Sequence, residues 1–355
     1  MEVRLLTYNV FMRPYFIKTN KSDYKSERLK QIGRSVLPHY DIVCFEEMFD
    51  TLTHRRHSML KMAQKAGFGY FVQSDPPSFG RSSLIDGGLL ILSRYPIVES
   101  AFLSFRQGVT SDSLPDKGVL FARVQVSPQH VLNIFHTHLQ ASYVVEEVEQ
   151  SLPNYYVRIR QFALMRAFIA EKLELFGRNG ELSLLVGDFN IDANFKQYPS
   201  AHLERLLGKE RYFEQNRLAN EYDLFMNAYN AKQLSFSTTD LFLHARGTHP
   251  ITYADAVPAA DGHGELPAET MLTGKEDYAT KQCLDYIFLV EPRNARMRPT
   301  LFVNSQSLRV EKFNENVPNV SQLSDHYGLS CVVCSMDYLN RNYALPQTQN
   351  NFLMI

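Results

Sequence analysis

Carboxylate, amide and imidazole side chains stand at the ends of several apolar runs in this chain. A layered fold displays side chains at the ends of its strands, where functional loops gather. The segments are LLTYN, VCFEE, HTHLQ, VGDFN, LDY and SDH, which contain Asn9, Glu47, His138, Asp188, Asn190, Asp285, Asp325 and His326. Each residue alone is explained as an ordinary turn residue or a solvated strand end. Together they supply oxygen ligands for a small divalent cation, imidazoles, and a carboxylate to orient a base, which are the parts of a metal-assisted hydrolase acting on phosphate.

Apolar runs rich in β-branched and aromatic residues predict the strands that position these side chains. They cover residues 3–10, 41–49, 88–93, 119–126, 131–138, 182–186, 284–290 and 327–333. Helical spacing of apolar residues predicts helices over about residues 22–38, 51–66 and 154–176, the first with Ser22 or Asp23 as its N-cap. Because helices interrupt groups of strands and do not follow every strand, the pattern favours an α+β or α/β sandwich with helices covering packed sheets.

The chain shows no internal repeat and no linker that would divide it. We therefore predict a single domain over residues 1–338, followed by a C-terminal extension over residues 339–355. Residues 254–281 contain several prolines, glycines and aspartates without periodicity, which predicts a long surface loop.

Charge and cysteine content limit the class of protein. The 37 Lys plus Arg and 38 Asp plus Glu leave a net charge of -1. The protein therefore has no overall positive charge to attract nucleic acid, and a nucleic-acid partner is disfavoured. Four cysteines are too few for a disulfide scaffold in 355 residues. Cys331 and Cys334 form a CxxC pattern, but a strand would place their sulfurs on opposite faces, so we interpret the cysteines as buried core thiols.

Membrane and export signals are not visible in the sequence. No apolar run approaches the length of about 20 residues that a membrane helix needs. The chain opens without a basic, apolar and cleavable leader, so we expect a cytoplasmic protein as written, and a secreted one if a leader was removed.

In their order along the chain, the motifs resemble the exonuclease-endonuclease-phosphatase superfamily, which includes pancreatic deoxyribonuclease. The resemblance rests on Asn9 after an opening strand, Glu47 in FEE, and the segments GDFN, LDYI and SDH, and it runs from about residue 3 to residue 333. It implies a four-layer fold in which two central, mostly antiparallel β-sheets are flanked by helices, with the site where the loop ends of the sheets converge.

Further segments look like the neutral, Mg-dependent sphingomyelinases of that superfamily. They are DGG at 86–88 leading into ILSRYPI at 91–97, DKGV at 116–119 and THLQA at 137–141. Inositol-phosphate phosphatases of the superfamily carry a Trp-rich signature, and this chain has no Trp. The resemblance implies hydrolysis of sphingomyelin to ceramide and phosphocholine, Mg²⁺ as cofactor with Mn²⁺ or Co²⁺ as substitutes, and a phospholipid at a membrane surface as partner. We expect a monomer.

The resemblance also implies which residues hold the metal ion. Glu47 would bind Mg²⁺, with Asn9 and Asp325 beside it or acting through water. The superfamily usually has Gln before the metal-binding Glu, and this chain has Glu46 there. We expect the additional carboxylate to alter the metal preference or the pKa of Glu47.

The same resemblance implies the catalytic roles. His326, oriented by Asp285, would take a proton from water. Asp188 and Asn190 would position that water or the phosphate for in-line attack. His138 would bind the phosphate or serve the leaving group.

By the same resemblance Lys117 would lie near the site, with a solvated strand-end lysine as the alternative. Two features limit how far substrate contacts carry over. Bacterial members carry an aromatic membrane-entering hairpin before SDH, but residues 308–320 contain only Phe313 as an aromatic residue. The acidic residue that often follows HLQA in those members is Ser142 here. Two other functions therefore stay open: a nuclease or phosphatase with the same site, and a non-catalytic binding module, which would typically have lost a metal or base position.

Overall fold

The computed structural model describes residues 1–76, 85–106, 108–142, 148–177, 180–195, 197, 221–315 and 319–335. The predicted C-terminal extension lies outside these residues. No helix among them is long and apolar enough to cross a bilayer.

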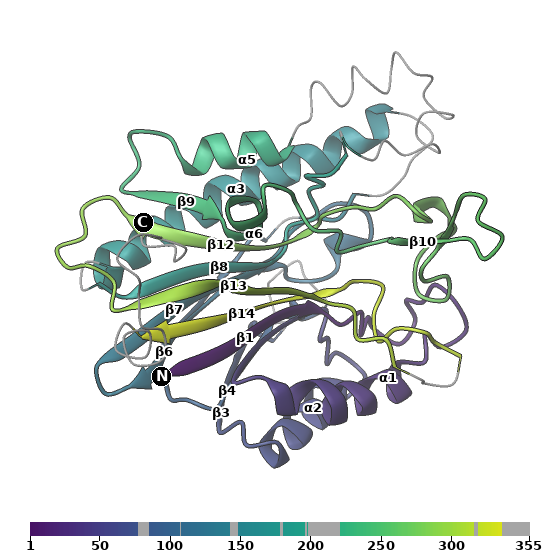
Figure 1. Ribbon diagram of the computed structural model, residues 1–355, viewed down its shortest axis with the longest axis horizontal. Coiled ribbons are helices and arrows are strands. Elements are labelled where there is room, and N and C mark those ends of the chain that lie inside the picture. Colours follow the sequence, from purple (N-terminus) through teal and green to yellow (C-terminus); the bar gives the residue numbers. More distant parts are fainter. Residues whose placement is uncertain are drawn as a thin grey trace.

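Two six-stranded sheets face each other at the centre of the molecule (Figure 1). The first has the order β13-β14-β1-β2-β4-β3, with bounds β1 Glu2–Asn9, β2 Ile42–Glu46, β3 Tyr70–Gln73, β4 Leu90–Ser93, β13 Leu301–Glu311 and β14 Gly328–Ser335. The second has the order β5-β6-β7-β8-β12-β9, with bounds β5 Ile97–Ser104, β6 Gly118–Ser127, β7 His130–His138, β8 Leu182–Asp188, β9 Phe236–Asp240 and β12 Asp285–Pro292. The pairs β1/β2 and β7/β8 are parallel and the other pairs are antiparallel, as predicted.

Helices cover the outer face of each sheet (Figure 1). On the first sheet lie α1 (Lys25–Gln31), which continues through a π turn and a 3₁₀ turn to His39, and α2 (Arg55–Lys65). On the second sheet lie α3 (Val148–Phe176) and α5 (Glu221–Tyr229). The short α6 (Leu241–Arg246) follows β9. The order helix, sheet, sheet, helix confirms the four-layer sandwich.

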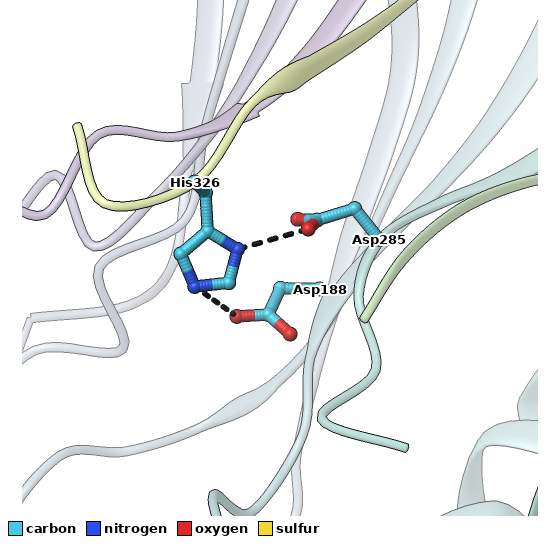
Figure 2. A group of neighbouring side chains, drawn as sticks. All are labelled: Asp188, Asp285 and His326. Carbon is cyan, nitrogen blue, oxygen red and sulfur yellow. Dashed lines mark hydrogen bonds and ion pairs between the residues drawn. The ribbon is translucent and has the colours of Figure 1, made fainter. Parts of the chain in front are cut away.

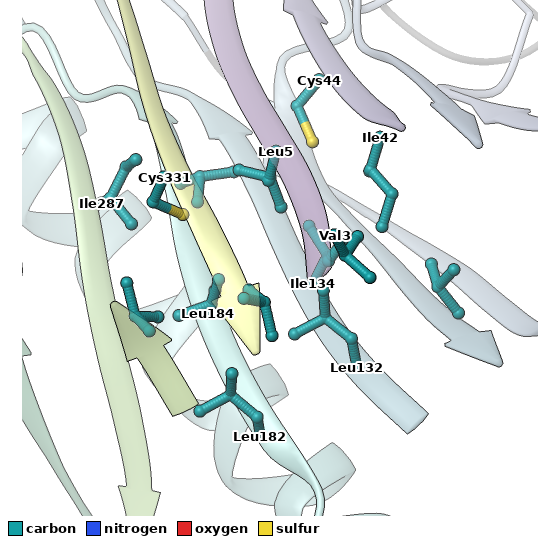
Figure 3. Packing of buried hydrophobic residues seen from close by; sticks show 14 of the residues in the cluster. Val3, Leu5, Ile42, Cys44, Leu132, Ile134, Leu182, Leu184, Ile287 and Cys331 are labelled. Atoms are coloured by element: carbon teal, nitrogen blue, oxygen red, sulfur yellow. The ribbon is translucent and has the colours of Figure 1, made fainter. Parts of the chain in front are cut away.

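The inner faces of the two sheets pack on each other through aliphatic side chains (Figure 3). Val3 and Leu5 of β1 point into this inter-sheet core, whereas Leu6 and Tyr8 point outward and pack beneath α1 and α2. Successive side chains of a strand alternate between faces, so a strand covered on both sides must be apolar almost throughout. All four cysteines are buried and free, as predicted.

The bounds of the helices differ from the predictions at their N-termini. Neither Ser22 nor Asp23 is the N-cap of α1, because that position is Tyr24 with a left-handed φ of 48°. The Asp23 carboxylate instead accepts the backbone N–H groups of Thr19 and Asn20. α2 begins four residues later than predicted and α3 begins six residues earlier.

Residues 254–281, which the sequence predicted to be a long surface loop, contain short regular elements. They contain an antiparallel hairpin of β10 (Ala256–Pro258) and β11 (Glu265–Pro267), followed by a 3₁₀ turn, Lys275–Asp277. The hairpin is separate from both large sheets and projects from the molecule (Figure 1).

Candidate functional site

The predicted site residues converge at one end of the inter-sheet core. Parallel strands end at the same edge of a sheet, so β1 and β2 bring Asn9 close to Glu47, the residue after β2. β7 and β8 end together with His138 opposite Asp188, and the antiparallel β12 starts with Asp285 opposite Asp188. Strand pairing therefore assembles residues that are far apart in the sequence.

An imidazole lies between two carboxylates at the centre of the site (Figure 2). His326 Nδ1 donates to Asp285 Oδ2 at 2.9 Å, and His326 Nε2 lies 3.8 Å from Asp188 Oδ2. Burial alone would lower the pKa of His326, but the charges of Asp285 and Asp188 outweigh it and raise that pKa well above its ordinary value. The imidazole is thus a strong proton acceptor held in one orientation.

Asp188 connects the two sheets at the site. Its carboxylate accepts Asn9 Nδ2 at 2.9 Å and the backbone N–H of Asn190 at 2.9 Å, and it lies 3.4 Å from His138 Nε2. Burial raises the pKa of Asp188 to about 6. Asn190 has a left-handed φ of 52°, and its Nδ2 donates to the carbonyl of Leu139 at 3.1 Å.

Lys117 is buried in the site, so the alternative of a solvated strand-end lysine is wrong. Its Nζ donates to Asp112 Oδ2 at 2.8 Å and to the Leu139 carbonyl at 2.7 Å, and it lies 3.1 Å from His138 Nε2. Burial and the Lys117 charge hold the pKa of His138 well below its ordinary value, so His138 is neutral. The two histidines of the site thus differ in protonation.

Buried oxygens on the β1/β2 side fit a hard cation. Glu47 has a left-handed φ of 56°, and its Oε1 accepts Asn9 Nδ2 at 3.3 Å. Its buried Oε2 has no hydrogen-bond partner among the described residues. Burial raises the pKa of Glu47, and it raises the pKa of Asp325 to about 7, with the Glu47 charge adding to that rise. A buried carboxylate oxygen without a partner is costly, and Mg²⁺ prefers such oxygen ligands.

A second possible metal group overlaps the catalytic residues. One ligand atom from each of Asp188, Asp285 and His326 lies within 4.8 Å of the others. This group contains an imidazole, a ligand that suits transition metals better than Mg²⁺. Glu47 and Asp325, by contrast, offer the carboxylate oxygens that Mg²⁺ prefers.

Glu46 points away from Glu47, into the space between the sheets. Its Oε1 accepts Thr7 Oγ1 at 2.7 Å and lies 2.7 Å from Nε2 of His136 on β7. Both ionisable side chains are fully buried. His136 and Asp112 are members of this region that were not predicted, although HTHLQ places His136 two residues before His138, on the same face of β7.

Comparisons with known proteins agree with this geometry. The model of the Endonuclease/Exonuclease/phosphatase family matches residues 6–326. A sphingomyelinase of Dictyostelium discoideum is 29% identical, over 89% of this chain and 76% of that protein. A sphingomyelinase C of Bacillus cereus is 27% identical, over 54% of this chain, which spans only 57% of that protein.

Solved structures share the fold. The beta toxin of Staphylococcus aureus, in a double mutant with bound magnesium ions, superposes with a TM-score of 0.57 at 19% identity and covers 93% of this chain and 99% of its own. A D. rerio TDP2 complexed with a single-strand DNA product gives a TM-score of 0.55 at 14% identity, covering 94% of this chain and 99% of its own.

Proposed function

The chain belongs to the Endonuclease/Exonuclease/phosphatase family, whose members are hydrolases of phosphate esters, and from that premise we propose that it hydrolyses sphingomyelin to ceramide and phosphocholine. Two relatives of known name are sphingomyelinases, and the match to one covers most of this chain. The proposed cofactor is Mg²⁺ bound by Glu47, Asn9 and Asp325. The proposed partner is a phospholipid surface. A monomeric state, and a cytoplasmic location or secretion after removal of a leader, stay predictions.

The observation that carries the proposal is the buried His326–Asp285 hydrogen bond beside Asp188. Asp285 fixes the ring so that Nδ1 is the donor and Nε2 is left to accept a proton from water. A cation held by Glu47 and Asp325 would lower the pKa of His326, because like charges disfavour the protonated ring. It would thereby favour the neutral imidazole that a general base needs.

Other side chains position the water and the phosphate. Asn9 and the Asn190 backbone hold Asp188 from two directions, so its carboxylate can orient the attacking water. Lys117 and neutral His138 offer a positive charge and a hydrogen-bonding ring for phosphate oxygens. Bound Mg²⁺ would supply charge neutralisation at a phosphate oxygen and at the leaving alkoxide.

Cleavage of nucleic acid is the second candidate. A structural neighbour was solved with a single-strand DNA product, and its fold is shared by this chain. The balanced charge of this chain, -1 overall, provides no general attraction to a polyanion.

Paired assays separate the two candidates. The purified protein is incubated with sphingomyelin and, separately, with supercoiled plasmid DNA, each with Mg²⁺ and with chelator. The proposal predicts phosphocholine release that the chelator abolishes, with the plasmid intact. Plasmid nicking without phosphocholine release would keep the metal site and reject the lipid substrate.

A further inference from the structure

Large apolar side chains are exposed on three segments that leave the site end of the sheets. Tyr15 (77% exposed) and Phe16 (58%) follow β1, Leu52 (82%) follows β2, and Val257 and Leu266 lie on the β10–β11 hairpin. We call these five residues the apolar rim. We propose that the apolar rim docks this protein on the surface of a phospholipid bilayer, an inference that rests on the proposed lipid substrate.

The three segments are joined by direct contacts. Arg55 Nη1, from the segment after β2, donates to the Arg13 carbonyl at 3.1 Å. Asn20 Nδ2, from the segment after β1, donates to the Met271 carbonyl at 2.8 Å, a few residues after the hairpin. Leu272 also packs with Phe11 in a small core. The three segments that carry the rim are therefore linked to one another, and α1 and the hairpin both lie toward the right of Figure 1.

The loop that carries Tyr15 and Phe16 is firmly held although its aromatic rings are exposed. The fully buried Arg28 donates to the carbonyls of Val10, Phe11 and Leu323, each at 2.8 Å. Lys25 Nζ donates to the carbonyls on both sides of the two aromatic residues, Pro14 and Ile17. Burial of these two exposed rings would be favourable, and the anchored loop keeps them in water. A partner that covers the rings would therefore gain the free energy of burying their apolar surface.

The rim suits a bilayer because of where it lies and what accompanies it. The substrate that we propose has its acyl chains in a membrane, and two of the three rim segments start directly after Asn9 and Glu47 of the site. Tyr beside exposed Lys18 and Lys21 is the side-chain combination that settles at a membrane interface, with rings among the lipids and ammonium groups at phosphates. The hairpin adds exposed Asp261 and Glu265, so the local charge is mixed and a zwitterionic surface fits it better than a strongly anionic one.

Vesicle binding tests the inference. Co-sedimentation with large phosphatidylcholine vesicles is measured for the wild type, for Tyr15→Ser/Phe16→Ser, and for the matched control Tyr70→Ser/Phe71→Ser, whose rings are exposed on β3. We expect the partition coefficient to fall about tenfold or more in the rim variant and to stay within about twofold in the control. The inference would be overturned if the rim variant bound as well as the wild type, or if binding by the control fell equally. It would also be overturned if the wild type did not bind vesicles, a result that would point to a protein partner for the rim.

Activity on two forms of substrate separates this inference from the proposed function. The rim variant should cleave a short-chain, water-soluble sphingomyelin analogue at the wild-type rate and vesicular sphingomyelin about tenfold more slowly. An equal loss on both substrates would contradict docking as the role of the rim. If the wild type cleaved neither substrate while the rim variant still lost vesicle binding, the proposed function would fail and the docking surface would stand.

Discussion

The carboxylates of the site differ in how their burial is compensated. Asp285 has the His326 ring and Asp188 has the Asn9 amide, whereas one oxygen of Glu47 has no partner among the described residues. Burying an ionised carboxylate without a partner is costly, and a bound cation removes that cost. Glu46 also has an unpartnered oxygen, but it lies in the apolar interior between the sheets, so among the carboxylates at the site Glu47 is the one whose burial favours a bound cation.

Glu47→Gln tests this assignment through stability, without an activity assay. The wild type should gain about 2.7 kcal/mol when Mg²⁺ reaches a hundredfold excess over its dissociation constant. The variant should gain far less, because the neutral amide is a weaker ligand for Mg²⁺. Thermal unfolding with and without Mg²⁺ measures the gain. Glu99→Gln, an exposed carboxylate on β5, is the control, and an equal Mg²⁺ gain in Glu47→Gln would reject Glu47 as a ligand.

A second carboxylate, Asp192, makes stability depend on pH. Its Oδ1 accepts the backbone N–H groups of Asn194 and Cys283, and burial raises its pKa to about 7. The folded state thus binds this proton more tightly than the unfolded state, and stability is lost as pH rises from about 4 through 7.

Asp192→Asn should remove that loss, because the amide oxygen keeps the role of acceptor without the charge. Urea unfolding at pH 5 and pH 8 is compared for the variant and the wild type. We expect the stability of the variant relative to the wild type to increase by roughly 1 kcal/mol or more between the two pH values. A constant difference would show that Asp192 does not titrate in this range.

The sequence picked out residues that the structure brings together at one end of the sheets, because each stands in a short motif at the end of an apolar run; their proposed roles come from the family resemblance. It could not predict the state of Lys117, since a lysine before a strand is usually solvated and only the packing around Asp112 and Leu139 buries it. The sequence also could not predict that the Glu46 side chain points between the two sheets, because that depends on how the sheets pack against each other.

At the scale of elements, β7, β8 and β12 act as the frame of the catalytic residues. Gly187, one residue before Asp188, has a φ of 133°, and a Cβ there would lie 2.0 Å from the Thr137 carbonyl oxygen on β7. Only glycine permits this close approach of two strands at that φ. The glycine of GDFN is therefore needed for the close packing of β7 against β8, and it takes no direct part in the proposed reaction.

Gly187→Ala should separate the ends of β7 and β8, and so move Asp188 away from His138. We expect a loss of roughly 3 kcal/mol in stability and a fall in phosphocholine release at temperatures where the variant is folded. Chemical unfolding and turnover measure the two effects. Gly69→Ala, where a Cβ meets nothing within 4 Å, should leave both unchanged; similar behaviour of the two variants would contradict the role of Gly187.

Several strands of the structure were not predicted from the sequence, because their apolar residues do not form a continuous or alternating pattern. β3 and β5 are edge strands with exposed residues such as Tyr70 and Val98, so their alternation is weak. β13 contains the polar run Asn304 to Gln306, where its register shifts. The predicted strands were mostly the central ones, where burial on both faces makes the apolar run continuous.

At the scale of the whole molecule, the two sheets are joined by polar contacts as well as by their apolar core. The Glu46–His136 pair links β2 to β7 in the interior, and Asn9 to Asp188 links β1 to β8 at the site. The element pattern predicted a sandwich and the family resemblance implied its four layers, but neither predicted these links, because a contact between two sheets depends on how they stack.

A double-mutant cycle measures the interior link. Glu46→Ala and His136→Ala should each cost roughly 3 to 5 kcal/mol, since each leaves a buried polar partner unpaired. The double variant should be more stable than the sum of the single losses predicts by about 1 to 3 kcal/mol. Additive losses in urea unfolding would mean that the two side chains do not interact.

The most direct test of the account is phosphocholine release from sphingomyelin by the wild type and by His326→Ala, with Mg²⁺ present and with circular dichroism to establish that the variant is folded. The account predicts Mg²⁺-dependent release by the wild type and a loss of at least about a hundredfold in the variant, the contribution expected of a general base. Near-normal turnover by a folded His326→Ala protein would contradict it.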